Sequence, residues 1–328
     1  MSHGKGKDTR MKAVVYTEYG RPEVLQLKEI DEPTPKDDEV LVKIHAASIQ
    51  QTDINFRTGT PLLARVLAGL LKPRNQILGC DYSGTVEATG MNVEEYSIGD
   101  EVYGQLNKRT GTHAEYISVS MREVSPKPKN LTFVEAATVG VSGTIALQCL
   151  RDHGEIQRKD KVLVNGASGG IGTFAVQIAK SYDTEVIGVC STANLELVKS
   201  IGADQVIDYT KEDFTERVDE YDIIFDAVRK NTFGNCKNAL TSKGIYVTTE
   251  FGPGIMLQMR MNSSLDGKRM VGMLMNVDQA DLVILTGLIE AGKIRPVIDR
   301  TYPLEEIADA HRYVEKGHAK GKVIMTIG

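Results

Sequence analysis

A glycine-rich turn between an apolar strand pattern and a helical pattern constrains this chain more than any other feature. Residues 161–165 are mostly apolar, and apolar side chains recur at helical spacing from Ile171 to Lys180. Glycines permit a tight turn and close backbone approach to a ligand, and a helix N-terminus offers free N–H groups and a positive dipole. We therefore predict a dinucleotide pyrophosphate site, against the alternative of a turn that only joins strand to helix. Its residues are Gly166, Ala167, Ser168, Gly169, Gly170, Ile171 and Gly172.

Strand and helix patterns alternate from Asp160 to about Gly292. The apolar runs are short and nearly continuous, as in strands that are covered on both faces. This region is therefore predicted to be α/β, with a doubly wound parallel sheet. The predicted strands are 161–165, 185–190, 205–208, 222–226 and 244–249, and the predicted helices are 171–180, 195–201 and 233–240.

The chain before this region reads as short strands separated by turns, with few helices. This pattern predicts an irregular barrel. After Pro296 a helical pattern and a last strand, 322–327, follow without another strand–helix unit, so we expect the tail to complete the first domain. The predicted early strands are 12–16, 24–29, 39–46, 82–88, 101–104 and 114–119.

Composition and hydropathy limit the classes of partner that this chain is expected to bind. Lys and Arg number 39 against 44 Asp and Glu, a net charge of −5, so we expect no nucleic-acid partner. The longest apolar stretch lies within Pro61–Arg74, a leucine-rich segment whose role the sequence leaves open, and it is too short to span a bilayer. We therefore expect no membrane partner. Residues 1–10 lack the apolar core of a signal peptide and are expected to be a disordered leader of a cytoplasmic protein.

Cofactor choice is read at the end of the second strand of the doubly wound sheet. An acidic residue there would bind the ribose hydroxyls of NAD and repel an added phosphate. This chain instead has Ser191, Thr192 and Asn194, which can donate to a 2′-phosphate, and Tyr209 follows the third strand. The pattern favours NADPH. The alternative is an ordinary polar loop with dual specificity, since the loop contains no Arg.

Ordered motifs along the chain resemble the medium-chain dehydrogenase/reductase superfamily, in its zinc-free quinone oxidoreductase-like branch. The resemblance implies a GroES-like β-barrel substrate domain, 11–133 and 296–328, around a Rossmann dinucleotide-binding domain, 134–295. It also implies a homodimer. The motifs that carry it include residues 11–15, 53–59, 78–87, 99–103, 140–144, 165–172, 201–204, 206–209 and 317–323.

The zinc ligands of related enzymes are missing at the matching positions, which hold Gln50, Cys80 and Asp81. A catalytic zinc needs about three protein ligands, and one thiol is too few. We therefore expect no metal. Cys80 is expected to be a small buried residue rather than a nucleophile.

The resemblance places the substrate beside the segment 50–57. The expected donors to a substrate oxygen are Asn55, Gln50 and Tyr82, each of which has a structural hydrogen-bonding role as its alternative. Asp53 and Arg57 are expected to form a local ion pair or network. By the same resemblance Thr144, Gly252 and Lys322 are further cofactor candidates, with helix capping the alternative for Thr144.

These features together predict hydride transfer from NADPH to a quinone or an α,β-unsaturated carbonyl. Such acceptors spread negative charge by their own conjugation and need no Lewis acid. Two alternatives remain open at this stage. One is an alcohol dehydrogenase or carbonyl reductase of the same superfamily, and the other is a sensor or structural protein that binds NADPH without turnover.

Overall fold

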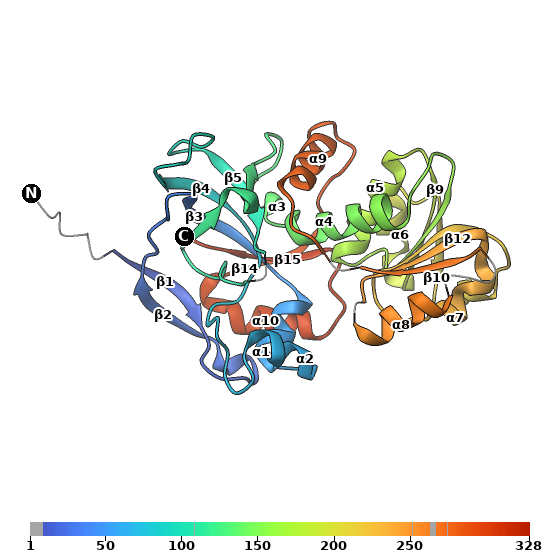
Figure 1. Cartoon of the computed structure of the whole chain (residues 1–328), viewed down its shortest axis with the longest axis horizontal. Helices are drawn as coiled ribbons and strands as arrows, with labels where there is room; N and C mark the ends of the chain where they lie inside the picture. The colour runs from blue at the N-terminus through green and yellow to red at the C-terminus, as the bar shows by residue number, and fades with distance from the viewer. Residues whose placement is uncertain (1–8, 108, 251, 263–266, 274) are drawn as a thin grey trace, which may run out of the picture. The chain divides into compact units, whose positions relative to one another are not determined.

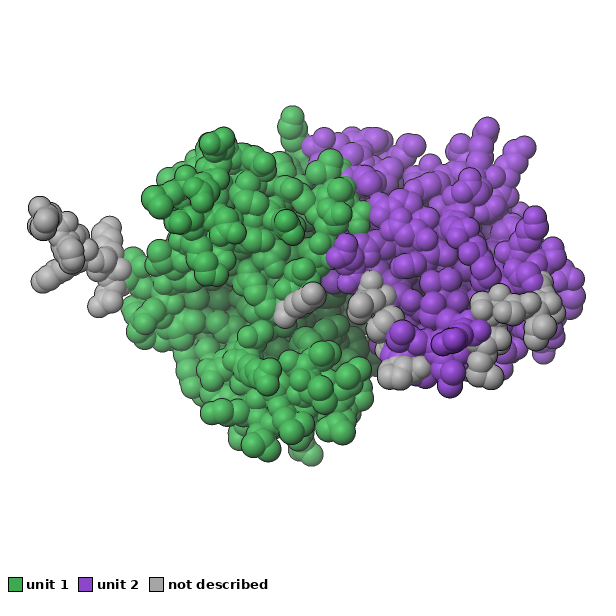
Figure 2. Space-filling model, in the orientation of Figure 1, with its two compact units in different colours: residues 1–141, 277–283, 298–328 green, residues 142–276, 284–297 purple. Residues whose placement is uncertain are grey.

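The computed structural model describes residues 9–107, 109–250, 252–262, 267–273 and 275–328 (Figure 1). The chain divides into two compact units (Figure 2). Unit 1 comprises residues 1–141, 277–283 and 298–328, and unit 2 comprises residues 142–276 and 284–297. Residues 134–141 and 277–283, which the sequence analysis assigns to the Rossmann domain, therefore belong to unit 1.

Unit 2 is built on a six-stranded sheet in which every neighbouring pair is parallel. The strand order is β10-β9-β8-β11-β12-β13, so the order reverses between β8 and β11. The strands are β8 (Lys161–Asn165), β9 (Glu185–Cys190), β10 (Gln205–Asp208), β11 (Tyr221–Asp226), β12 (Leu240–Thr248) and β13 (Arg269–Gly272).

The central strands are apolar because both faces of the sheet are covered. In β8 the side chains from Val162 to Asn165 are all buried, without the alternation of a half-exposed strand. Helices α5 and α6 lie on one face of the sheet and α7 and α8 on the other (Figure 1). The helices of this part of the chain are α4 (Gly140–Gln148), α5 (Gly170–Ser181), α6 (Leu195–Ser200), α7 (Phe233–Cys236), α8 (Pro253–Asn262) and α9 (Gln279–Glu290).

Unit 1 contains a β1-β2 hairpin and a seven-stranded sheet. The C-terminal tail returns to this sheet, where β15 pairs with β3 in antiparallel register. The hairpin strands are β1 (Arg10–Val15) and β2 (Gln26–Asp31), and the sheet strands are β3 (Glu39–Ile49), β4 (Asp81–Thr89), β5 (Glu101–Gln105), β6 (Tyr116–Ser120), β7 (Val124–Pro126), β14 (Ile298–Pro303) and β15 (Lys322–Thr326). The helices are α1 (Gln51–Thr58), α2 (Leu62–Ala68), α3 (Phe133–Ala136) and α10 (Ile307–Glu315).

Helix α10 packs its apolar face into the core of unit 1. Ile307, Ala310 and Val314 belong to that core, and His311 lies on the same face with its side chain fully buried. Neither ring nitrogen of His311 has a hydrogen-bond partner among the described residues. Burial lowers the pKa of His311 well below 6.5, and the neighbouring His113 and Arg57 act in the same direction. The folded protein therefore holds this imidazole neutral.

This burial predicts a stability that declines in acid. His311 in the unfolded chain takes up a proton near pH 6.5, whereas the folded ring does not, so the free energy of unfolding should fall as the pH drops below that value. His311→Leu should make the free energy of unfolding, measured by urea titration, less dependent on pH between about pH 7 and about pH 5. Some dependence should remain, because burial lowers the pKa of His113 as well. His318→Gln, at an exposed histidine, is the control, and an equal slope in both variants would contradict the prediction.

Candidate dinucleotide site and substrate-side residues

The loops that follow β8 and β11 flank the point where the strand order of unit 2 reverses. In open α/β sheets, ligands bind outside the carboxyl ends of the strands at such a switch point. A direct link joins the two strand ends, because Asn165 Nδ2 donates to Asp226 Oδ1 at 3.0 Å. The predicted glycine-rich turn begins at the next residue, Gly166, and therefore lies at this switch point.

The turn is shaped by contacts that exclude side chains at two glycines. Gly166 has a φ of +84°, and a Cβ there would lie 2.3 Å from Val228 Cγ1. A Cβ on Gly172 would lie 2.0 Å from the carbonyl oxygen of Gly166. Helix α5 can approach β8 this closely only without that atom. At Gly169 the nearest atom to a Cβ would be 3.5 Å away, so this position is less constrained.

Helix α5 directs its N-terminus toward the turn. The Thr173 N–H donates to the Gly169 carbonyl, which is the first bond of the helix. The N–H groups of Gly170, Ile171 and Gly172 precede that bond and cannot be satisfied within the helix. Together with the helix dipole, these donors suit a pyrophosphate.

Asp226 organises the second loop, a role that the sequence analysis missed. This fully buried carboxylate accepts backbone N–H groups from Val228, Arg229 and Asn231 at 3.2, 3.1 and 3.0 Å. It also accepts the hydroxyl of Tyr246 at 2.9 Å. Because Val228 packs over Gly166, this network also holds the loop against the glycine-rich turn. The sequence signal that could have identified Asp226 is its position as an aspartate at the end of an apolar strand, β11.

The polar residues after β9 reach back to the same turn. Asn194 Nδ2 donates to Ser168 Oγ at 3.0 Å and lies 3.4 Å from Ser191 Oγ. The sequence predicts these three residues to bind the cofactor. The structure brings them together on unit 2.

A carboxylate that the sequence analysis did not consider lies beside them. Asp208, at the end of β10, accepts the Thr192 hydroxyl and, at 2.7 Å, the Thr210 hydroxyl. The hydrogen bond from Thr192 holds the pKa of Asp208 well below its usual range, and Lys211 lies 3.3 Å away. Asp208 is therefore an anion with its own partners, and Lys211 adds a cation to this edge of the sheet. The side chain of Tyr209, between them in sequence, is exposed.

The remaining cofactor candidates lie in different surroundings. Thr144 is buried within α4. Around Gly252, no described residue beyond its chain neighbours has an atom within 4 Å of where a Cβ would lie. Lys322 lies in β15 of unit 1, where its buried ammonium group is 3.2 Å from Asp81 Oδ2. The Lys322 ammonium group therefore has a carboxylate partner within unit 1.

Asp81 is the centre of a buried polar cluster in unit 1. Besides Lys322, it accepts Ser48 Oγ at 2.7 Å and Gln50 Nε2 at 3.0 Å on Oδ2, and the Val141 N–H at 2.7 Å on Oδ1. The Gln50 amide group is therefore already bound within the protein. Its role in this structure is to complete the cluster.

The other two donor candidates differ in availability. Asn55 is half-buried on α1, and its Oδ1 accepts from Gln51 Nε2 at 3.3 Å, which leaves its amide N–H groups as donors without an acceptor among the described residues. Tyr82 is fully buried in the core of unit 1, and its hydroxyl donates to the Glu123 carbonyl at 3.0 Å. Tyr82 therefore has the structural hydrogen-bonding role that the sequence analysis left as its alternative. Side chains alternate in direction along a strand, and in β4 the side chain of Tyr82 points into the core.

The residues at the zinc positions of related enzymes do not fit a zinc ion. Gln50 has an amide there, burial raises the pKa of the Cys80 thiol well above its usual value, and Asp81 already binds the Lys322 ammonium group. A neutral thiol and a neighbouring cation oppose metal binding. Among the described residues, no group of three His, Cys, Asp or Glu side chains could hold a metal ion.

The expected Asp53–Arg57 pair is not formed. Asp53 instead accepts the backbone N–H groups of Gln50 and Gly79 at 2.8 and 2.9 Å. The buried Arg57 guanidinium pairs with Glu315 at the end of α10. The two residues lie four positions apart on α1, but each is held by a partner from outside that helix.

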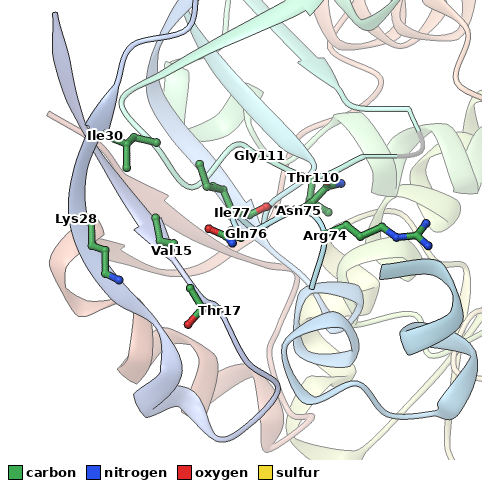
Figure 3. A pocket seen from close by; sticks show the side chains of 10 residues that line it. All are labelled: Val15, Thr17, Lys28, Ile30, Arg74, Asn75, Gln76, Ile77, Thr110 and Gly111. Atoms are coloured by element: carbon green, nitrogen blue, oxygen red, sulfur yellow. Dashed lines mark hydrogen bonds between the residues drawn. The ribbon is translucent and has the colours of Figure 1, made fainter. Parts of the chain in front are cut away.

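The pocket found in unit 1 lies away from these candidates. It has a volume of about 520 Å³, within the usual range for ligand sites, but it contains none of Gln50, Asn55 and Asp81. We therefore do not assign the substrate to it. Figure 3 shows the residues that line it, which are Val15, Thr17, Lys28, Ile30, Arg74, Asn75, Gln76, Ile77, Thr110 and Gly111.

Comparisons with known proteins agree with this architecture. The alcohol dehydrogenase GroES-like domain family matches residues 36–129, and the zinc-binding dehydrogenase family matches residues 201–325. The chain is 33% identical to the mitochondrial NAD(P)H oxidoreductase RTN4IP1 of Mus musculus, over 100% of this chain and 92% of that protein. It is 34% identical to 2-methylene-furan-3-one reductase of Solanum lycopersicum, over 97% of this chain and 79% of that protein.

A solved structure shows the same fold. The quinone oxidoreductase from Coxiella burnetii superimposes with a TM-score of 0.88 at 30% identity, over 98% of this chain and 100% of that one. The chain belongs to the medium-chain dehydrogenase/reductase superfamily, in its quinone oxidoreductase-like branch. The predicted α/β fold, a Rossmann sheet with a GroES-like domain, is confirmed.

Gly172 and Gly169 provide a matched test of the geometry of the turn. Gly172→Ala places a methyl group against the Gly166 carbonyl and should lower the free energy of unfolding by about 1–3 kcal/mol. The sign is diagnostic, because alanine within a helix otherwise stabilises by roughly 0.5–1 kcal/mol. Gly169→Ala, where space is available, should change the free energy by less than about 0.5 kcal/mol. Urea unfolding without cofactor measures both, and equal effects would show that the close approach is not the constraint.

Proposed function

We propose that this protein is an NADPH-dependent, zinc-independent reductase of quinones or α,β-unsaturated carbonyls. The observation that carries the proposal is the dinucleotide cradle of unit 2, where a glycine-rich turn, a helix N-terminus and the loop held by Asp226 meet at the switch point. The names of the mouse, tomato and Coxiella relatives, which describe NAD(P)H, furanone and quinone oxidoreduction, support the same class of reaction.

The polar edge of unit 2 supports the choice of NADPH. Ser191, whose hydroxyl oxygen accepts from Asn194, supplies a neutral donor at the end of β9, and Lys211 supplies a cation at the end of β10. The Asp208 carboxylate at this edge is offset by the Lys211 ammonium group, which lies 3.3 Å away. A 2′-phosphate would therefore meet donors at this edge.

On the substrate side, the chain's contribution is hydrogen bonding. NADPH, when bound, supplies the hydride. A conjugated acceptor develops negative charge on its oxygen, and a donor placed at that oxygen lowers the barrier. Asn55 is the proposed donor, because its amide N–H groups remain available whereas Gln50 and Tyr82 donate within the protein.

We further propose a cytoplasmic homodimer. All four cysteines are free thiols, as expected of a reducing compartment. The sheet of unit 2 ends in the strands β10 and β13, and an edge strand can pair with that of a second copy. No described helix has the length and apolar character needed to cross a membrane.

The activity is tested directly by following NADPH oxidation with quinones and enones in the presence of a zinc chelator. We expect turnover to survive chelation. Asn55→Ala should lower kcat by about tenfold or more, because it removes the donor to the developing oxyanion. The KM for NADPH should not change.

Thr52→Ala, on the same helix and exposed, is the control for Asn55→Ala.

Three outcomes would contradict the proposal. A requirement for stoichiometric zinc, or turnover only with simple ketones or alcohols, would favour a carbonyl reductase or alcohol dehydrogenase. NADPH binding without turnover of any acceptor would favour a sensor.

Cofactor preference has its own test. Ser191→Asp places a carboxylate at the end of β9, where it can bind a ribose hydroxyl and repel a 2′-phosphate. The ratio of kcat/KM for NADPH to that for NADH should fall at least about tenfold. Ser200→Asp, at an exposed serine of α6, is the charge control. An unchanged ratio in Ser191→Asp would show that the phosphate does not bind at this edge.

A further inference from the structure

Large apolar side chains project into solvent from α2 and the turn that follows it. We call them the leucine surface, which consists of Leu62, Leu63, Val66, Leu67, Leu70 and Leu71. All six are more than half exposed, and Leu71 is 91% exposed. Soluble proteins seldom leave so many neighbouring apolar side chains uncovered, and those that do use them for contacts.

The segment is held in this conformation by its opposite side. Ala64 is buried, and the Arg65 guanidinium lies over the ring of Tyr19 at 4.8 Å. The Tyr19 hydroxyl donates to the Gly69 carbonyl just beyond the helix. The leucine surface is therefore the outward face of a segment that is anchored to unit 1.

The charged residues of the segment that carries the leucine surface are all basic. Between Asp53 and Asp81 the sequence contains no acidic residue, although the whole chain carries a net charge of −5. Lys72 and Arg74 directly follow the surface, and both are exposed. In Figure 3 the Arg74 side chain extends away from the β1-β2 hairpin. An apolar face bordered by cations is complementary to an anionic surface that has an apolar interior.

We propose that the leucine surface docks unit 1 on anionic lipid bilayers. Acyl chains accept protruding side chains without shape complementarity, whereas a protein partner would need a groove fitted to all six. Binding is peripheral, because the apolar stretch is too short to span a bilayer. The sequence led us to expect no membrane partner for that reason, and the proposal departs from this expectation because of the exposed surface. The inference does not depend on the proposed reductase activity.

The test is flotation of the purified full chain with vesicles. One set contains equal parts of phosphatidylcholine and phosphatidylglycerol, and the other contains phosphatidylcholine alone. We expect binding to the anionic vesicles that weakens as salt is added. The variant Leu63→Gln/Leu67→Gln/Leu71→Gln should lose at least about tenfold in vesicle affinity. The variant Lys72→Gln/Arg74→Gln should bind less and lose most of the salt dependence.

Matched controls separate this surface from general apolar or basic character. Met91→Gln/Ile98→Gln removes two side chains of unit 1 that are 85% and 70% exposed but lie outside the surface, and binding should not change. Arg122→Gln/Lys243→Gln removes two exposed cations outside the surface, and binding should again not change. Circular dichroism and thermal unfolding check that every variant folds.

The contrary outcomes are distinct from one another. Absence of wild-type binding to anionic vesicles overturns the proposal. If the leucine variant changes only the mass measured by light scattering, the surface joins copies of this chain. If it changes only the KM for a long-chain quinone relative to a short one, the surface contacts substrate. In either case the bilayer is not the partner.

Discussion

The contact between the Gly166 carbonyl and the Gly172 backbone determines how unit 2 presents its cofactor site. Only because Gly172 carries no side chain can α5 begin so close to the end of β8, and only because Gly166 carries none can Val228 pack over the turn. That approach fixes where the first N–H groups of the helix point, and an anion can then be bound by backbone alone. The loop held by Asp226 packs against the same turn through Val228. The cradle thus depends on two loops, and each is rigid for a different reason.

Two buried carboxylates, Asp226 and Asp81, organise the backbone and side chains around them. Asp226 collects three backbone N–H groups and one hydroxyl, and Asp81 collects a hydroxyl, an amide, an ammonium group and a backbone N–H. A buried carboxylate is tolerated only when its oxygens are satisfied in this way. Such centres fix loops and strand ends.

The cluster around Asp81 lies where related enzymes carry zinc ligands. In β15 Lys322 returns from the C-terminal tail and places a fixed positive charge beside the carboxylate. Gln50 completes the arrangement at the start of α1. The result is a neutral, hydrogen-bonded centre that ties the tail, α1 and β4 together.

The sequence by itself determined five of the six strands of unit 2 and the position of its turn, because the period of apolar residues and the order of the glycines are local properties. It did not predict β13 or α8, and the helix predicted at 233–240 is α-helical only to Cys236. Strands β8, β9 and β10 were predicted with their observed bounds. It also indicated which residues follow the strands of the sheet, since parallel strands end on one edge.

Only the tertiary structure decided which polar groups meet. Asn165 and Asp226 are 61 positions apart, Asp81 and Lys322 are 241 apart, and Arg57 and Glu315 are 258 apart. No local pattern encodes such pairs. The burial of Tyr82 and the exposure of the leucine surface were likewise decided only by the tertiary structure. Whether an apolar or aromatic side chain is covered depends on elements that are distant in the chain.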